Sequence, residues 1–213
     1  AIGVPCVVVD YGYLRRVSGR ATFSTGHWQV GINRLGWVPP FKCPKDRLDA
    51  LGVEFRTRKK RGDRIYVCGQ HDGDPSHGLD RDGIVRWALQ TIDDLRHVTG
   101  CEIVWRSHPD SKIGIGNVEN STGPIDWNDV HSVVTINSNI GHEALINGVP
   151  VICDESAPYS ELGNDCFTEG LFVPDLRTRR NYFARLAYAQ WTLSEIRDGE
   201  PIRWLIEKRL VSK

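Results

Sequence analysis

The chain has 213 residues, which is enough for one sizeable domain or for one domain with a smaller companion. Lys and Arg together number 27, as do Asp and Glu, so the balanced charge gives no general reason to expect nucleic-acid or membrane binding. No apolar run is long enough to span a bilayer, and no signal-peptide pattern opens the chain, so we expect a cytoplasmic protein.

Six cysteines are scattered along the chain without a C-x-x-C pair, which argues against a zinc ribbon or a redox pair. Cys6, Cys68 and Cys153 lie in apolar strand-like runs, where a free thiol behaves as a small hydrophobic side chain. We therefore expect reduced, buried cysteines and no bound metal ion.

The first predicted strand covers residues 4–10 and ends in Asp10, which is followed by aromatic residues and by Arg15 and Arg16. Ligand crevices of parallel sheets open at the carboxyl ends of strands, so Asp10, Arg15 and Arg16 are candidate ligand-binding residues. A surface loop with solvated arginines is an equally good interpretation of the same residues.

Alternating Trp28, Val30 and Ile32 predict a strand or hairpin, and residues 44–51 predict a short helix. Residues 56–61, RTRKKR, form the one basic run. Such runs are usually solvated loops, and the functional alternative is contact with a polyanion, either a nucleic-acid backbone or an acidic glycan.

A second strand at residues 64–68 leads into a glycine-rich turn at 69–74. Gly69 would let the backbone approach a ligand closely, and Asp72 lies in the same turn. The turn lacks the G-x-G-x-x-G pattern of dinucleotide-binding sites. Residues 83–98 then predict an amphipathic helix, whose apolar stripe we assign to the core.

A third strand at residues 102–106 is followed by His108 and Pro109. Because proline disfavours a helical conformation in the residue before it, we expect the imidazole to point into the crevice, where it could stabilise a leaving phosphate. A structural histidine with satisfied hydrogen bonds is the alternative. We expect a mobile loop at 113–123 and a short helix at 124–130.

The stretch from Ser132 to Asp154 is the most informative one. Residues 132–136 predict a buried strand, residues 140–147 a helix, and residues 149–153 the next strand, as in a parallel sheet. Backbone N–H groups at a helix start, beside small polar side chains, form an anion site. The candidates for binding a phosphate there are Ser138, Asn139, Gly141 and His142.

The remaining residues predict one more short strand at 172–173 and then helices, with Trp191 and Trp204 holding this tail on the sheet. Strands that alternate with crossover segments predict an α/β fold with a Rossmann-like, doubly wound parallel sheet. The N-terminal region is too short to form a second full domain of this kind.

Three motifs together resemble the donor-binding domain of GT-B glycosyltransferases, most closely the capsular-polysaccharide and Kdo/sialyltransferase-like group. They are His108-Pro109, the turn TINSN at 135–139 and the run GHEALINGVPV at 141–151. The opening VDYGYLRR and the closing AYAQWTLSEI also resemble a family of bacteriophage proteins of uncertain role, some of which are placed near DNA-modifying glycosyltransferases.

The resemblance implies that His108 and the Ser138 turn hold the donor phosphate and that Glu143 binds hydroxyl groups of the sugar or ribose. Arg106, near His108, would neutralise charge on the leaving phosphate in place of a metal ion. The co-substrate would be a nucleotide sugar, with no further cofactor.

Asp10 or Asp72 would then deprotonate the acceptor hydroxyl. The acceptor implied is either a hydroxymethylated base in phage DNA or a surface glycan. The DNA alternative is favoured by the basic residues Arg15, Arg16 and 56–61.

The chain departs from this family in its N-terminal region, which contains a single clear strand instead of a full acceptor domain. The predicted organisation is a reduced acceptor-side region at 1–62, a nucleotide-sugar-binding domain at 63–175 and C-terminal helices at 176–213. A homodimer, a partner protein or a segment before Ala1 could supply the missing part. Two other functions stay open: a non-catalytic nucleotide- or nucleic-acid-binding module, and a sugar-nucleotide epimerase or hydrolase.

Overall fold

The computed structural model describes residues 4–17, 19–57, 60–167 and 170–211. The chain forms two compact units, and each is described by itself. Unit 1 comprises Ala1–Val53 and Arg180–Lys213, and unit 2 comprises Glu54–Arg179. This division differs from the three consecutive segments expected from the sequence, because the first and last parts of the chain contribute strands to one sheet.

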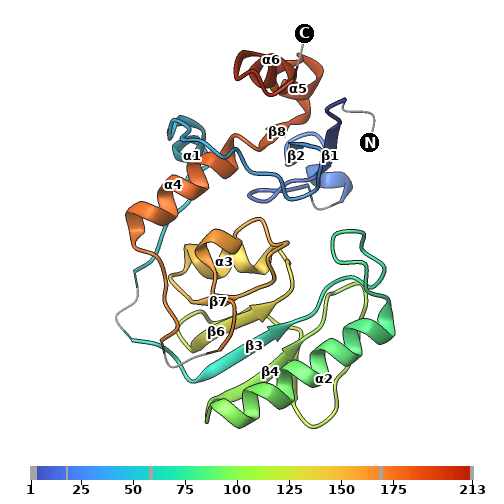
Figure 1. Ribbon diagram of the computed structural model, residues 1–213, viewed down its shortest axis with the longest axis vertical. Coiled ribbons are helices and arrows are strands. Elements are labelled where there is room, and N and C mark those ends of the chain that lie inside the picture. Colours follow the sequence, from blue (N-terminus) through green and yellow to red (C-terminus); the bar gives the residue numbers. More distant parts are fainter. Residues whose placement is uncertain (1–3, 18, 58–59, 168–169, 212–213) are drawn as a thin grey trace. The chain divides into compact units, whose positions relative to one another are not determined.

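Unit 2 is built on a five-stranded parallel sheet in the order β5-β4-β3-β6-β7 (Figure 1). Its strands are β3 (Arg64–Cys68), β4 (Glu102–Arg106), β5 (Glu119–Ser121), β6 (Val130–Thr135) and β7 (Val151–Ile152). From the central β3 the chain first moves outward to β4 and β5, and it then returns to the other side of β3 to form β6 and β7. The predicted α/β fold with a doubly wound parallel sheet is therefore confirmed, and its topological switch point lies between β3 and β6.

Helices cover both faces of this sheet. α2 (Arg81–Val98) connects β3 to β4, and α3 (Ile140–Ile146) connects β6 to β7 on the opposite face (Figure 1). Right-handed crossovers that proceed in opposite directions from the central strand require this placement. The apolar stripe predicted for the helix at residues 83–98 is confirmed on α2, where it packs on the strands of the parallel sheet. Its buried residues include Ile84, Ala88, Ile92 and Leu95.

Three short segments of unit 2 differ from the sequence prediction. β5 lies inside the expected loop and pairs with β4. Residues 124–130 form a turn instead of a helix. The side chain of Asp126 accepts the backbone N–H of Asn128, and its carbonyl oxygen accepts that of Asp129. Residues 172–173 form no strand, and the side chain of Asn164 bonds to both backbone groups of Phe172 instead.

Unit 1 is built on a three-stranded antiparallel sheet in the order β1-β2-β8. Its strands are β1 (Val7–Tyr11), β2 (His27–Ile32) and β8 (Gln190–Thr192). Its helices are α1 (Asp46–Ala50), the later part of α4 (Leu176–Ala187), α5 (Leu193–Arg197) and α6 (Glu200–Glu207). Short 3-10 turns lie at Arg20–Thr22 in this unit and at Ser160–Leu162 in unit 2. The strand predicted from alternating apolar residues is confirmed as β2.

The C-terminal tail packs on the antiparallel sheet. Trp191 and Trp204 join Val30, Ile32 and Leu205 in one apolar cluster. The sequence predicted helices throughout this tail and missed β8, because its residues continue the apolar pattern of α4. The two tryptophans are anchored on a sheet, as expected, but this sheet belongs to unit 1.

Gln190 joins β8 to the loop that follows β1. Its side-chain oxygen accepts the backbone N–H groups of Tyr13 and Leu14 at 3.0 and 2.9 Å, and its amide nitrogen donates to the Leu14 carbonyl oxygen at 3.0 Å. Gln190 is fully buried. Because an unpaired buried amide is strongly destabilising, this residue fixes the loop to the strand.

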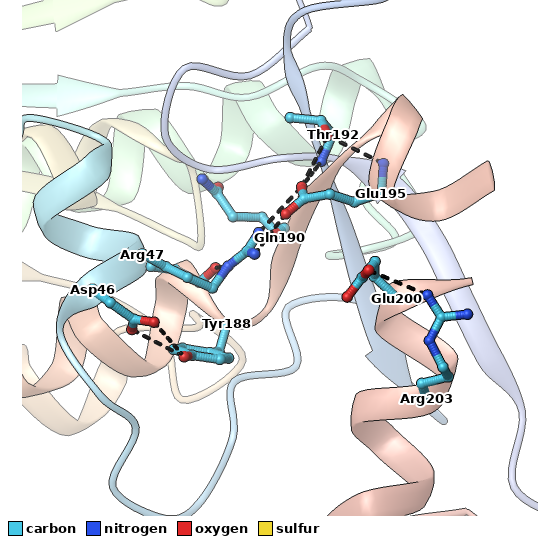
Figure 2. Close-up of polar contacts among 9 residues, drawn as sticks. Asp46, Arg47, Tyr188, Gln190, Thr192, Glu195, Glu200 and Arg203 are labelled. Carbon is cyan, nitrogen blue, oxygen red and sulfur yellow. Dashed lines mark hydrogen bonds and ion pairs between the residues drawn. The ribbon is translucent and has the colours of Figure 1, made fainter. Parts of the chain in front are cut away.

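Arg47 on α1 holds the start of α5 and the end of α4 together. Its guanidinium donates to Glu195 at 2.6 Å and to the carbonyl oxygens of Ala187 and Gln190 at 3.1 and 2.9 Å (Figure 2). The same group lies 4.0 Å from the ring centre of Trp191. One planar cation therefore satisfies backbone groups from two elements, which a lysine could not do in the same geometry.

All six cysteines are free, as predicted. Their expected burial is confirmed for Cys68 alone among the three strand cysteines, because Cys6 is exposed and Cys153 is half-buried. Among the described residues, no helix combines the length and the apolar character that a bilayer crossing requires.

We predict that Arg47→Ala lowers the free energy of unfolding by about 2 kcal/mol, because it removes the ion pair with Glu195 and the guanidinium bonds to two carbonyl oxygens. Chemical denaturation followed by circular dichroism measures the change. Arg203→Ala, which removes an exposed ion pair with Glu200 in the same unit (Figure 2), is the matched control and should change stability by less than about 0.5 kcal/mol. Equal effects of the two substitutions would contradict the assigned role of Arg47.

Candidate functional site

The carboxyl ends of β3 and β6 are joined by a pair of amide side chains. Gln70 Nε2 donates to Asn137 Oδ1, and the backbone N–H of Asn137 donates to Gln70 Oε1 at 2.8 Å. Gln70 is buried, whereas Asn137 is half-buried. Open α/β sheets bind ligands outside the carboxyl ends of their strands at the switch point, so this pair marks the floor of the candidate site.

Two loops converge on Asn137. The Ser76 hydroxyl, in the loop after β3, donates to Asn137 Oδ1 at 3.3 Å. Asn137 Nδ2 donates to the Ser76 carbonyl oxygen at 3.0 Å and to Ser156 Oγ, in the loop after β7, at 3.2 Å. Asn137 therefore orders the loops that surround the switch point.

Asp72 is held by Ser111, a buried residue in the loop after β4. Ser111 Oγ donates to Asp72 Oδ1 at 2.5 Å and accepts the backbone N–H of Asp72 at 3.1 Å. The hydrogen bond from Ser111 lowers the pKa of the Asp72 carboxyl group. Asp72 is thus ionised and weakly basic, which suits the acceptance of hydrogen bonds from hydroxyl groups better than proton abstraction.

His108 lies at the same edge of the sheet, beside His71. The two rings meet edge to face with their centres 5.6 Å apart. The backbone N–H of Asp110 donates to His108 Nδ1 at 3.2 Å, so Nε2 carries the hydrogen in the neutral ring. The side chain of His108 is 28% exposed, so part of it is accessible to a ligand.

The turn before α3 is shaped by Tyr159. Its hydroxyl donates to the Ser138 carbonyl oxygen at 2.6 Å, and a Cβ atom at position 141 would lie 2.1 Å from Tyr159 Cζ. Gly141 is therefore required by the packing of Tyr159. The backbone N–H groups of Gly141 and His142 donate to the carbonyl oxygens of Ser138 and Asn139, each at 3.0 Å, so two of the groups expected to bind phosphate are bonded within the turn.

His142 lies in the interior, with 1% of its surface exposed. It shares a 2.9 Å hydrogen bond with Asn139 Oδ1, and its ring packs edge to face on Tyr159 with the ring centres 4.7 Å apart. Burial lowers the pKa of His142 to about 3, so the ring is neutral. Both predicted residues take part in this contact, and Asn139 does not cap α3 with its side chain.

The other residues predicted for this edge occupy different environments. Glu143 is exposed on α3. Gly69 is buried, and a Cβ atom there would lie 2.5 Å from Trp105 Cη2, so its lack of a side chain has a packing reason. Arg106 is half-buried at the end of β4 and donates to the Gly123 carbonyl oxygen.

Asp10, Arg15 and Arg16 lie in unit 1. The expected parallel-sheet crevice after the first strand is absent there, because β1 pairs antiparallel with β2. The Asp10 carboxylate accepts the Tyr11 N–H at 2.8 Å, and both arginines are exposed. The structure does not bring these three residues together with the switch-point residues within one unit.

Arg58 and Lys59 of the predicted basic run lie outside the described residues. The flanking residues are tied to unit 2, since the Arg56 carbonyl oxygen accepts from buried Arg179 at 3.1 Å and Arg61 donates to the Leu171 carbonyl oxygen. These contacts give the ends of the run a structural role.

Sequence reasoning missed Gln70, Ser111 and Tyr159 as site-forming residues. Gln70 has a recognisable signal, because it is a polar residue two positions after a buried strand at the predicted crevice. Ser111 and Tyr159 have none, because each acts on a residue from a distant segment.

No known protein-family profile matches the chain, and no curated protein sequence matches it. Several solved structures are similar in fold, and two of them are described as transferases of Thermosulfurimonas dismutans KpsC. The beta Kdo 2,4 transferase is 16% identical with a TM-score of 0.56, and the match covers 90% of this chain and 75% of that chain. The beta Kdo 2,7 transferase is 17% identical with a TM-score of 0.56, and the match covers 89% and 71%.

At these identities the likeness is one of fold. The resemblance to glycosyltransferases that the motifs predicted is therefore supported at the level of the fold. The likeness to bacteriophage proteins stays a prediction.

We predict that Gly141→Ala destabilises the chain by about 2 kcal/mol, because the added methyl group must displace the buried Tyr159 ring. The higher helix propensity of alanine offsets only about 1 kcal/mol of the steric cost. Thermal and chemical denaturation measure the effect. Gly116→Ala is the control, since its Cβ would meet no atom within 4 Å, and its stability should stay within about 0.5 kcal/mol of the wild type.

We predict that His142 makes stability depend on pH between about 6.5 and 3. In this window the unfolded chain protonates this histidine and the folded chain does not, so folding stability falls as the pH falls. His142→Gln is less stable than the wild type at pH 7, and this deficit should shrink by about 2 kcal/mol at pH 5.

The measurement is urea denaturation at each pH. His97→Gln, at an exposed position on α2, should follow the wild-type pH dependence. A deficit of His142→Gln that stays constant from pH 7 to 5 would show that the folded chain also binds the proton.

Proposed function

We propose that the chain binds a nucleotide sugar at the carboxyl edge of the unit 2 sheet and acts as a glycosyltransferase. The observation that carries the proposal is the convergence of polar side chains from the ends of β3, β4 and β6 at the switch point, in a fold like that of sugar transferases. Related nucleotide-binding sheets use the same edge for phosphate groups.

The donor phosphates are held by His108 and by the turn at Ser138. The Nε2–H group of His108 offers a hydrogen bond to a phosphate oxygen, and its side chain is accessible. Arg106, at the end of β4 and two residues before His108, supplies permanent positive charge. In this proposal these cationic and hydrogen-bonding groups stabilise the leaving phosphate without a metal ion.

Asp72 serves as an ionised acceptor for a hydroxyl group of the donor sugar. Its low basicity, set by the bond from Ser111, makes it a weak candidate for the general base. Glu143 is exposed on α3, next to the turn, where it can bind ribose or sugar hydroxyls.

The acceptor in this proposal is a glycan hydroxyl. The solved proteins of similar fold are described as Kdo transferases, which supports a sugar acceptor above a hydroxymethylated base in DNA. One observation favours a second candidate function, a nucleotide-binding module without turnover. It is the lowered pKa of Asp72, held by the bond from Ser111, which makes this carboxylate a poor general base.

A nucleotide-release assay tests the proposal. The protein is incubated with a panel of nucleotide sugars, with EDTA, and with a glycan acceptor, hydroxymethylated DNA or no acceptor. Release only with the glycan is the expected result, and release only with the DNA would support the other acceptor. Release without acceptor would indicate a hydrolase, and conversion of the donor into an isomeric nucleotide sugar would indicate an epimerase. Binding with neither release nor conversion would indicate the non-catalytic module.

We predict that Ser138→Ala and His108→Ala each weaken donor binding about 10-fold or more, which corresponds to one hydrogen bond to a charged group. Titration calorimetry with the donor identified above measures the change. His131→Ala is the matched control, because His131 lies on the same sheet at the amino end of β6. Unchanged binding in both site variants would remove the assigned phosphate site.

A further inference from the structure

Three aromatic residues of unit 1 form an exposed cluster that the proposed donor site does not use. We call Tyr11, Phe23 and Trp28 the aromatic platform. Tyr11 stacks on Trp28 with ring centres 5.6 Å apart and planes 16° apart, and Phe23 meets Trp28 edge to face at 5.2 Å. Tyr11 is 55% exposed and Phe23 is 50% exposed, and the neighbouring Val9 is 51% exposed.

The platform is the open end of an otherwise covered sheet face. Tyr11, Trp28 and Trp191 are cross-strand partners on β1, β2 and β8, so their side chains lie on one face. On the same face Val30, Ile32 and Trp191 are buried in a cluster with Leu205 of α6. Within the described residues, this cluster does not extend over Tyr11 and Phe23, so their apolar surface is exposed to water.

The stacking also determines which surface is available. One side of the Tyr11 ring lies against Trp28, so the exposed half of the side chain includes the opposite, flat side. A pyranose ring presents a flat patch of C–H groups that packs on such a ring by dispersion, while its hydroxyls stay in water.

Hydrogen-bond donors border the platform. Arg16 lies five residues after the end of β1, and its backbone pairs with that of His27, next to Trp28. Arg20 opens the 3-10 turn that ends at Phe23. Arg16 and Arg20 are exposed and can donate to the hydroxyl groups of a sugar that lies on the platform, whereas the Arg15 guanidinium lies beside Gly52.

We propose that the aromatic platform binds the pyranose ring of a glycan. The inference goes beyond the proposed transfer reaction, because binding at this surface needs neither a nucleotide sugar nor turnover. The platform presents on the order of 300 Å² of apolar surface, which suits one or two sugar rings and falls short of the roughly 800 Å² per partner of a stable protein interface. Nucleic acid would need several phosphate contacts besides a stacked base, and the chain carries no net positive charge.

Binding to an array of neutral and acidic pyranose oligosaccharides, without any nucleotide sugar, tests the proposal. The strongest binder is then titrated calorimetrically against variants. Tyr11→Ala and Phe23→Ala should weaken binding at least 10-fold, whereas Tyr11→Phe, which keeps the ring, should stay within about 3-fold of the wild type. Phe172→Ala is the matched control, because Phe172 is exposed to the same extent, 51%, in unit 2.

Circular dichroism of each variant verifies that the fold is retained. Absence of any bound oligosaccharide overturns the proposal, as does equal binding by Tyr11→Ala and Phe172→Ala. Binding of oligo(dT) that requires Tyr11, in place of a glycan, overturns it too. The same holds for a concentration-dependent dimer that Tyr11→Ala abolishes. Loss of glycan binding in Tyr11→Ala with unchanged donor binding would separate this surface from the proposed donor site.

Discussion

The organisation of unit 2 depends on how β3 and β6 end side by side. Their backbones diverge there, because one strand leads to a helix on one face and the other leads to a helix on the opposite face. The amide pair of Gln70 and Asn137 closes the gap, since each group offers both a donor and an acceptor. Asn137 then fixes Ser76 and Ser156, and the Gln70 carbonyl oxygen lies 3.5 Å from the Ser111 hydroxyl that holds Asp72. The loops of the candidate site are thus positioned by the contact between Gln70 and Asn137.

A second group of residues shapes the site without facing it. Tyr159 and His142 are buried behind the turn at Ser138, and neither is charged at neutral pH, since burial raises the pKa of Tyr159 well above its usual value and lowers that of His142. Their contacts with Ser138, Asn139 and Gly141 fix the backbone of the turn. Residues that the sequence predicted as ligands therefore divide into those that can meet a ligand, such as His108, and those that hold the turn rigid.

The parallel sheet could be predicted from the sequence because its signals are local. β-branched strands, a helix with a regular apolar stripe and glycine-rich turns each lie within a short window. The first two strands of unit 1 could be predicted, but its assembled sheet could not, because β8 pairs with β2 across about 160 residues and nothing within Gln190–Thr192 distinguishes it from a continuing helix. The same limit explains why Asp10, Arg15 and Arg16 were expected at the wrong kind of strand end, and why the pairing of Asp72 with Ser111 was missed.

The division of unit 1 between distant parts of the chain determines the order in which the protein can form on the ribosome. β1 and β2 emerge before unit 2, and a two-stranded ribbon is at best marginally stable in water. At about 5 to 20 residues per second, β8 follows β2 after roughly 10 to 30 seconds. Unit 2 is continuous and emerges within that interval, so its sheet can fold early. The apolar face of the β1–β2 hairpin stays exposed until Trp191 and α6 have been synthesised. During this interval the exposed apolar face and the unpaired edge of β2 favour aggregation of the nascent chain and binding by chaperones.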